Sequence, residues 1–303
     1  MKMTRNLCKR LSAFSAFLAA MLATLPAYAI LGQPEPGGTA LQASASPMKE
    51  RMIFFHDSLM MPIITAISVF VLLLLLIVIF RFNSKANPVP SKTTHNTVLE
   101  VLWTLVPVLI LVVVVIPSMK MLYYVDKTTE SEMTLKAIGD QWYWNYEYPD
   151  NGISFASNIV QDKDLKPGQP RLLETDNPVV LPINTNIKIL TASTDVIHSW
   201  AVPAFGIKMD AVPGRLNETW VRIDKEGTFY GQCSQLCGQN HAYMPIEVKA
   251  VSKEAFADWV HKQGGKMSGD TAAAAPAAAA PVAASAPAKN APKKIKNKKA
   301  GEK

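Results

Sequence analysis

The sequence predicts a two-helix transmembrane hairpin, then an all-β domain, then a disordered tail rich in alanine, proline and lysine. Two charge-free apolar runs, Leu59 to Phe80 and Val101 to Met119, are each long enough to cross about 30 Å of hydrocarbon as a helix. From about Asp126 the pattern changes to short runs of alternating apolar and polar residues, which is typical of strands. Beyond Gln263 large apolar residues are nearly absent, so this segment cannot bury a core.

Residues 1–29 resemble a secretory signal. The positive charges at its start are Lys2, Arg5, Lys9 and Arg10. An apolar run follows, and Ala27-Tyr28-Ala29 offers a small-residue cleavage site. The alternative is a retained N-terminal anchor. Export would place the mature chain in an oxidising compartment, with residues 30–57 as a short segment outside the cytoplasm.

The two apolar runs predict transmembrane helices over residues 58–82 and 98–122, joined by a link over residues 83–97. A soluble helix is a poor alternative, because residues 72–80 are apolar on every face. Residues 81–97 include Arg81, Lys85 and Lys92 but no acid, so the positive-inside rule places this link in the cytoplasm. Glu100 lies near the cytoplasmic end of the second helix, where an ionisable group is either functional or simply faces water.

The all-β domain is predicted over residues 126–262. Apolar and charged residues alternate in Ile187 to Ile189, in Val221 to Asp224 and in Ile246 to Ala250, and turn residues such as Pro213-Gly214 lie between such runs. Many short strands in about 130 residues indicate a sandwich or a barrel. After these strands, Ser252 is a suitable cap for a short helix with one apolar stripe.

The formal charge of +7 is unevenly distributed along the chain. The signal contributes +4, and the segment from Lys289 to Lys303 contributes +6 within the predicted tail, residues 263–303. Between Asp126 and Lys262 there are 13 basic and 18 acidic residues, which give a net charge of −5. An acidic domain argues against a nucleic-acid partner and favours a basic one.

The most informative segment is CSQLCGQNHAYM, which runs from Cys233 to Met244. It places two thiols, the imidazole of His241 and a thioether within twelve residues, and these are the soft ligands that select copper. Since Cys8 lies in the predicted signal, Cys233 and Cys237 are the only cysteines of the mature chain.

Three other interpretations compete with copper. A disulfide between Cys233 and Cys237 suits the compartment, but it explains neither His241 nor Met244. Zinc rarely uses a thioether ligand. A copper-chaperone thiol pair on a thioredoxin-like fold would require a βαβ pattern, whereas the sequence predicts strands.

A single blue-copper site would take one Cys, two His and a weak Met ligand. His198 follows a predicted strand of the same domain and is the best candidate for the second His. One blue site would leave a cysteine unused, whereas two coppers bridged by both thiolates would use every donor. Such a site would carry electrons rather than transform a substrate, and Asp195 could tune it.

Taken together, these features resemble subunit II of cytochrome c oxidase, the haem–copper respiratory oxidase, in its bacterial form. The resemblance covers the chain from about Phe54 to Gln263 and rests on the hairpin and on the motifs DVIHSW, DAVPGR and CSQLCGQNHAYM, which occur in the family's order. It implies a cupredoxin-like barrel and the electron-entry subunit of a proton-pumping complex that reduces oxygen to water. On its own the chain would not reduce oxygen.

The resemblance also implies roles for individual residues. The ligands of two copper ions in a binuclear CuA centre would be His198, Cys233, Cys237, His241, Met244 and the main-chain oxygen of Gln235. Trp142 would receive the electron from cytochrome c and Glu100 would open a proton pathway. Glu147, Asp150 and Asp195 would lie in the acidic surface on which cytochrome c docks, and Arg215 would face subunit I near its haem.

The implied partners are oxidase subunit I, other oxidase subunits, cytochrome c and the lipid bilayer. The implied location is the bacterial inner membrane, as a multi-pass protein with its N-terminus and copper domain on the periplasmic side. Two residues depart from the family pattern. Gln235 replaces a Glu whose side chain helps to bind a magnesium ion shared with subunit I, and an amide is the weaker ligand. Asp140 stands where a His is usual. A copper-delivery or thiol–disulfide protein is the alternative function.

Overall fold

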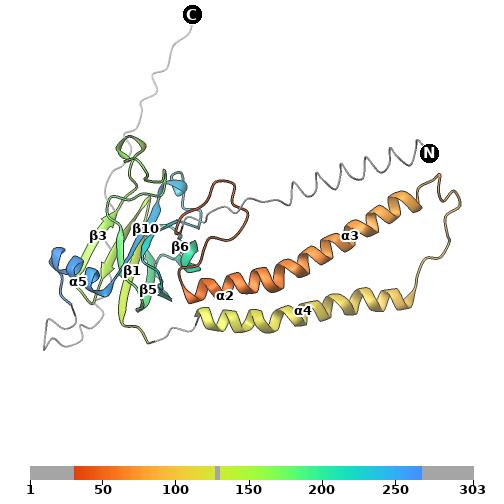
Figure 1. Ribbon diagram of the computed structural model, residues 1–303, viewed down its shortest axis with the longest axis horizontal. Helices are drawn as coiled ribbons and strands as arrows, with labels where there is room; N and C mark the ends of the chain where they lie inside the picture. The colour runs from red at the N-terminus through yellow and green to blue at the C-terminus, as the bar shows by residue number, and fades with distance from the viewer. Residues whose placement is uncertain (1–30, 127–129, 268–303) are drawn as a thin grey trace, which may run out of the picture. The chain divides into compact units, whose positions relative to one another are not determined.

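The computed structural model describes residues 31–126 and 130–267 (Figure 1). The predicted signal, residues 1–29, and residues 268–303 of the predicted tail (263–303) lie outside the described residues. Within them, a helical segment precedes a domain of ten strands and one C-terminal helix. The predicted order of a helical hairpin followed by an all-β domain is therefore confirmed.

Two long helices form the hairpin. The first is continuous from Pro47 to Arg81 and consists of α2 (Pro47–Phe55), a π-helical turn η1 (His56–Met60) and α3 (Met61–Arg81). The second is α4 (Thr97–Asp126). Both are long and apolar enough to cross a membrane by length and composition. Their leucine and valine side chains are about half exposed all along α3 and α4, as expected for helices that meet lipid or other subunits rather than a core of their own.

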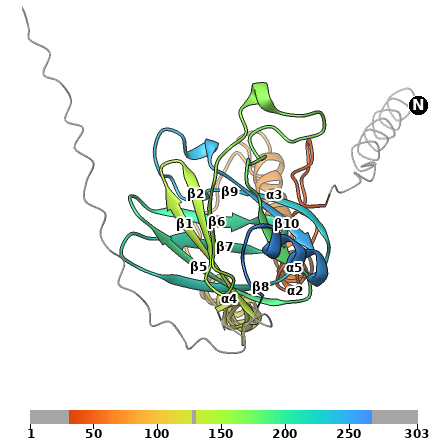
Figure 2. The ribbon, with the colours of Figure 1, turned by 90° about the vertical axis from the view of Figure 1, so that its left-hand side faces the viewer.

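The all-β domain consists of three sheets. Its strands are β1 (Met133–Asp140), β2 (Tyr143–Tyr148), β3 (Ile153–Ser157), β4 (Val179–Pro182), β5 (Asn186–Ser193), β6 (His198–Val202), β7 (Ile207–Ala211), β8 (Asn217–Arg222), β9 (Gly227–Gln232) and β10 (Pro245–Val251). The sheet orders are β3-β2-β1-β5-β8, β4-β10-β9 and β6-β7. β1 pairs in parallel with β5 and β10 pairs in parallel with β4, whereas the other ladders are antiparallel. Figure 2 shows these sheets around one core.

The core follows from the alternation that the sequence shows. In β1 and β5 every second side chain is buried, and Leu135, Ile187 and Ile189 are fully inaccessible. Trp144 and Trp200 are likewise fully buried. Burial of large apolar and aromatic side chains is the main stabilising contribution to such a domain.

The N-terminal segment closes part of this core. Ala45 and Met48, at the start of the helical segment, are 0% and 1% exposed and belong to the same apolar cluster as the strands. The Ala45 amide donates to the Ala204 carbonyl at 3.0 Å, and the Asp224 amide donates to the Ala45 carbonyl at 3.0 Å. The sequence pattern did not indicate this contact, because the segment is short and carries no strand alternation.

The predicted terminal helix is confirmed as α5 (Lys253–Lys262). The Ser252 hydroxyl accepts a hydrogen bond from the Ala255 amide at 3.2 Å and so caps the helix. Phe256 and Val260 are buried, and Trp259 packs against Tyr148 with ring centroids 5.2 Å apart. The apolar stripe is therefore a packing surface.

Glu247 on β10 is a buried carboxylate whose ionisation should weaken the fold. Its side chain is 1% exposed, and its Oε2 accepts hydrogen bonds from the Thr175 amide and hydroxyl at 2.9 and 3.0 Å. Burial raises the pKa of Glu247, and the charge of Glu174 raises it further, against the opposing effects of Thr175 and Lys249. A raised acid pKa contributes stability that is complete below the unfolded-state pKa and is lost as pH rises through the folded-state pKa.

Glu247→Gln should therefore raise the thermal unfolding midpoint of the detergent-solubilised chain at pH 7, because the folded state no longer has to bury an ionised carboxylate there. Glutamine keeps the acceptor for Thr175 but cannot ionise, and the lost ion pair with the half-exposed Lys249 is worth little. The gain should shrink as the pH is lowered towards 4. Glu226→Gln, at an exposed position, is the control. A lower midpoint at pH 7 would contradict the expectation.

Candidate metal centre

The metal-ligand segment is the connection between two paired strands. β9 ends at Gln232 and β10 begins at Pro245, and these two residues are register partners, so the intervening loop closes on itself. The Cys233 amide donates to the Met244 carbonyl at 3.2 Å, which brings the first and last predicted ligands of the loop together. The thiols of Cys233 and Cys237 are free.

His198 reaches the loop from another sheet. It is the first residue of β6 and is fully buried. The Ser234 amide donates to the Ser199 carbonyl at 3.0 Å and holds the loop against β6. Donor atoms of His198, Cys233 and Cys237 all lie within 4.8 Å of one another.

The remaining predicted donors surround these three. The two Sγ atoms are 3.8 Å apart, too far for a disulfide bond. Cys233 Sγ lies 3.9 Å from His198 Nδ1 and 3.3 Å from the main-chain oxygen of Gln235. Cys237 Sγ lies 3.5 Å from His241 Nδ1 and 3.6 Å from Met244 Sδ. The structure thus brings all six predicted donors together.

Asp195 orients the imidazole of His198. Its Oδ1 is 2.8 Å from His198 Nε2, and the carboxylate also accepts from the Val196 amide at 2.6 Å. Burial raises the pKa of Asp195, but the hydrogen bonds from His198 and from the backbone outweigh it and hold the pKa below its ordinary value. An ionised acceptor at Nε2 places the ring proton there and leaves Nδ1 free to bind a metal on the side of Cys233.

The two thiols differ in how readily they lose a proton. Burial raises the pKa of Cys233, but hydrogen bonds with His198 and with the backbone of Gln235 and Ser199 lower it below the ordinary value. Burial raises the pKa of Cys237, and the adjacent charge of Cys233 raises it further. One thiolate therefore forms easily, whereas a second needs a nearby positive charge such as a metal ion.

Gly139 on β1 provides the space for His198, and sequence reasoning did not identify it. A Cβ atom added at Gly139 would lie 2.7 to 2.9 Å from Cδ2, Cγ and Cβ of that ring. Trp144 borders the imidazole from β2, with ring centroids 6.0 Å apart. No local sequence signal marks Gly139, because the clash involves a residue 59 positions later in the chain.

Trp142 lies between β1 and β2 and contacts the metal loop. Its indole Nε1 donates to the Cys237 carbonyl at 3.3 Å. The side chain is partly buried and packs against the core cluster. The indole is thus connected to the Cys237 thiol through one hydrogen bond and the covalent bonds within Cys237.

The predicted docking acids lie in the same domain but have different surroundings. Glu147 on β2 forms an ion pair with Lys136 at 2.9 Å. Asp150, in the turn after β2, accepts from the Thr134 amide at 2.7 Å. Asp195 is engaged by His198. Arg215 is exposed in the turn between β7 and β8 and forms no ion pair within residues 31–126 and 130–267.

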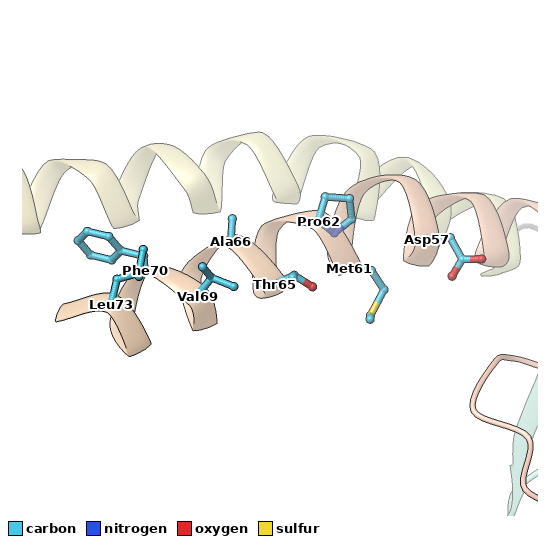
Figure 3. A pocket seen from close by; sticks show the side chains of 8 residues that line it. All are labelled: Asp57, Met61, Pro62, Thr65, Ala66, Val69, Phe70 and Leu73. Atoms are coloured by element: carbon cyan, nitrogen blue, oxygen red, sulfur yellow. The ribbon is translucent and has the colours of Figure 1, made fainter. Parts of the chain in front are cut away.

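Two features of the hairpin lie outside this domain. Glu100 is in the first turn of α4, where its carbonyl accepts from the Thr104 hydroxyl at 2.9 Å. Figure 3 shows a shallow groove along the first long helix, whose lining side chains include Asp57, Thr65 and Phe70. The groove contains none of the predicted metal ligands.

The donor set fits copper. Four of the six donors are sulfur or imidazole nitrogen atoms from Cys and His, a fifth is a thioether, and the sixth is a carbonyl oxygen. Cys233, Cys237, His198 and Met244 are each at most 5% exposed, so the side chains of these four residues are shielded from water. The thioether of Met244 favours copper over zinc, because zinc is bound by Cys, His and carboxylate ligands.

The comparisons with known proteins identify one protein family. The family model described as cytochrome c oxidase subunit II, periplasmic domain, matches residues 133–251, and that described as its transmembrane domain matches residues 34–121. A probable cytochrome c oxidase subunit 2 of Rickettsia bellii is 48% identical over 79% of this chain and 89% of its own length. Cytochrome c oxidase subunit 2 of Cereibacter sphaeroides is 46% identical over 78% of this chain and 84% of its own.

Among solved structures, the periplasmic domain of subunit II of cytochrome oxidase of Bradyrhizobium japonicum is 49% identical. The match covers 46% of this chain and 97% of the solved chain, with a TM-score of 0.43. The two family models together match most of the described chain, and the relatives match along both the hairpin and the β domain. The chain therefore belongs to the cytochrome c oxidase subunit II family.

Proposed function

We propose that this subunit accepts electrons from cytochrome c at a binuclear copper centre and passes them to haem in subunit I. Membership of the family makes the chain a copper-associated membrane protein and part of the haem–copper oxidase, an oxidoreductase that works with partner subunits.

The observation that carries the proposal is the convergence of six donors around two free thiols. His198, Cys233, Cys237, His241, Met244 and the main-chain oxygen of Gln235 would hold the metal. Copper held by these residues would supply one-electron redox chemistry. The protein contributes a closed loop that is hydrogen-bonded to β6, which would keep the donors in place in both oxidation states.

Electron entry is proposed at Trp142. Its indole is partly exposed and donates a hydrogen bond to the carbonyl of Cys237, so one side of the ring can meet a donor protein while the other contacts the site. The acidic charge of the domain would steer a basic cytochrome c towards it. Glu147 and Asp150 would contribute to this surface, and Asp195 mainly to the orientation of His198.

The positive link between the helices supports a periplasmic copper domain and a cytoplasmic position for Glu100. Glu100 would then be placed to admit protons on the side opposite the copper loop. Arg215 would face subunit I.

Magnesium binding is proposed to be weak in this chain. The side chain of Gln235 is exposed and carries an amide, which is a poorer ligand for a hard cation than a carboxylate. The copper role of Gln235 is independent of this change, since it uses the main-chain oxygen.

The test is copper loading of the purified full chain in detergent. We expect two coppers per chain and, after partial oxidation, an EPR spectrum of one unpaired electron shared by two copper nuclei. A four-line spectrum with one copper per chain would contradict the binuclear centre. One Cu(I) per chain with a readily formed disulfide would instead indicate copper delivery or thiol–disulfide exchange.

A further inference from the structure

We propose that Gln141 is a positioning residue that joins the two halves of the copper site and raises its reduction potential. This inference rests on the proposed function, because it concerns the copper centre described above. Gln141 lies between β1 and Trp142, on neither of the two segments that carry the metal ligands.

The first connection runs through its main chain. The Gln141 amide donates to Asp195 Oδ2 at 2.7 Å, and the other oxygen of that carboxylate is 2.8 Å from His198 Nε2. The two oxygens of one carboxylate are thus divided between Gln141 and the metal-binding imidazole. Any residue at position 141 other than proline can make this bond.

The second connection runs through its side chain. Gln141 Nε2 donates to the Cys237 carbonyl at 2.7 Å, and this carbonyl also accepts the longer bond from Trp142 at 3.3 Å. The carbonyl of a metal-binding cysteine therefore has two donors from consecutive residues. Gln141 consequently links the His198 side of the site to the Cys237 side. Gln141 and Cys237 are 96 positions apart in the sequence.

Gly238 allows this close approach. Its φ angle of +121° lies in a region that residues other than glycine rarely adopt. A Cβ atom there would be 3.0 Å from Gln141 Nε2 and 3.2 Å from Trp142 Cζ2. The loop is thus shaped so that the amide of Gln141 and the indole of Trp142 both reach the Cys237 carbonyl.

The expected effect on the metal is electrostatic. Reduction adds a negative charge to the centre, and the N–H of Gln141 directs the positive end of its dipole towards the residue that carries a bridging thiolate. Hydrogen bonds near cluster sulfur atoms are known determinants of reduction potential. Removing the N–H should therefore make the reduced state less favourable, and a negative charge at the same position should do so more strongly.

The experiment compares the full chain, loaded with copper in detergent, with its Gln141→Leu and Gln141→Glu variants. Leucine removes the donor at similar size, and glutamate replaces the donor with a negative charge. Potentiometric titration should give the highest reduction potential for the unaltered chain, a lower one for Gln141→Leu and the lowest for Gln141→Glu. Copper content should remain the same in all three. Gln161→Leu and Gln161→Glu, at an exposed position, are the matched controls and should leave the potential unchanged.

The outcomes separate this inference from the proposed function. Equal potentials in the three chains, each with the shared two-copper EPR spectrum, would overturn the role of Gln141 and leave the copper centre standing. Loss of copper from both variants would also overturn it, because the Gln141 side chain would then be required for copper binding rather than for setting the reduction potential. An unaltered chain without the two-copper spectrum would contradict the proposed function and this inference together.

Discussion

Replacing Gly139 with alanine should greatly lower the copper affinity of the chain, although Gly139 offers no ligand atom. The added Cβ would lie within 2.9 Å of three atoms of His198, including its own Cβ, so a simple rotation of the ring cannot relieve the clash. His198 must then move away from Cys233 or β1 must separate from β6. The loss of one ligand position should lower copper affinity by about 100-fold or more, since even changes outside the ligand set cost 10- to 100-fold.

Copper content after dialysis against a weak chelator, together with the EPR spectrum, measures this effect. Gly38→Ala is the control, because an added Cβ at that exposed position meets only Glu35 of its own turn. Circular dichroism would show that the β domain is still folded. Full copper retention in Gly139→Ala would mean that His198 is not placed as described or is not a ligand.

Trp142→Phe should slow the entry of electrons from reduced cytochrome c by about tenfold or more, which corresponds to about 1.4 kcal/mol in effective barrier. Phenylalanine keeps an aromatic ring in the packing but removes the Nε1–H that donates to the Cys237 carbonyl. The hydrogen bond between the partly exposed ring and the site would then be lost. Because no ligand changes, the copper spectrum should remain intact.

Stopped-flow reduction of the assembled oxidase by cytochrome c measures this rate. Trp259→Phe on α5 is the matched control, since Trp259 packs against Tyr148 and Phe256 rather than against the metal loop. Electron entry at the unaltered rate in Trp142→Phe would remove Trp142 from the pathway. A changed copper spectrum would show that the substitution had disturbed the site itself.

The hairpin and the metal-binding segment were accessible from sequence because their signals are local. A helix that spans a membrane needs an unbroken apolar run, and residues 59–80 and 101–119 contain one each. The loop from Cys233 to Met244 places four donors within twelve residues, so their proximity needs only a closed loop. Strand alternation in β5 and β10 likewise depends on neighbouring residues.

Other features depended on contacts between distant residues. The participation of Ala45 and Met48 in the core of the β domain carries no periodic signal. The sequence from Ile246 to Ala250 also gives no sign that Glu247 is buried, since Glu247 occupies an outward position in the alternating pattern. It is buried because Thr175, from a distant loop, lies against it and donates a hydrogen bond to its carboxylate.

The sequence by itself determined which chemistry is available: two membrane-length helices, an acidic β domain, and thiol, imidazole and thioether donors in one short loop. Only the tertiary structure decided how that chemistry is assembled. The parallel pairing of β1 with β5 and the contact of β6 with β9 bring His198 to within 3.9 Å of Cys233, make Gly139 necessary, and place Gln141 and Trp142 on the Cys237 carbonyl. Composition and periodicity report on neighbours along the chain, whereas these distances depend on strand pairing between segments that lie tens of residues apart.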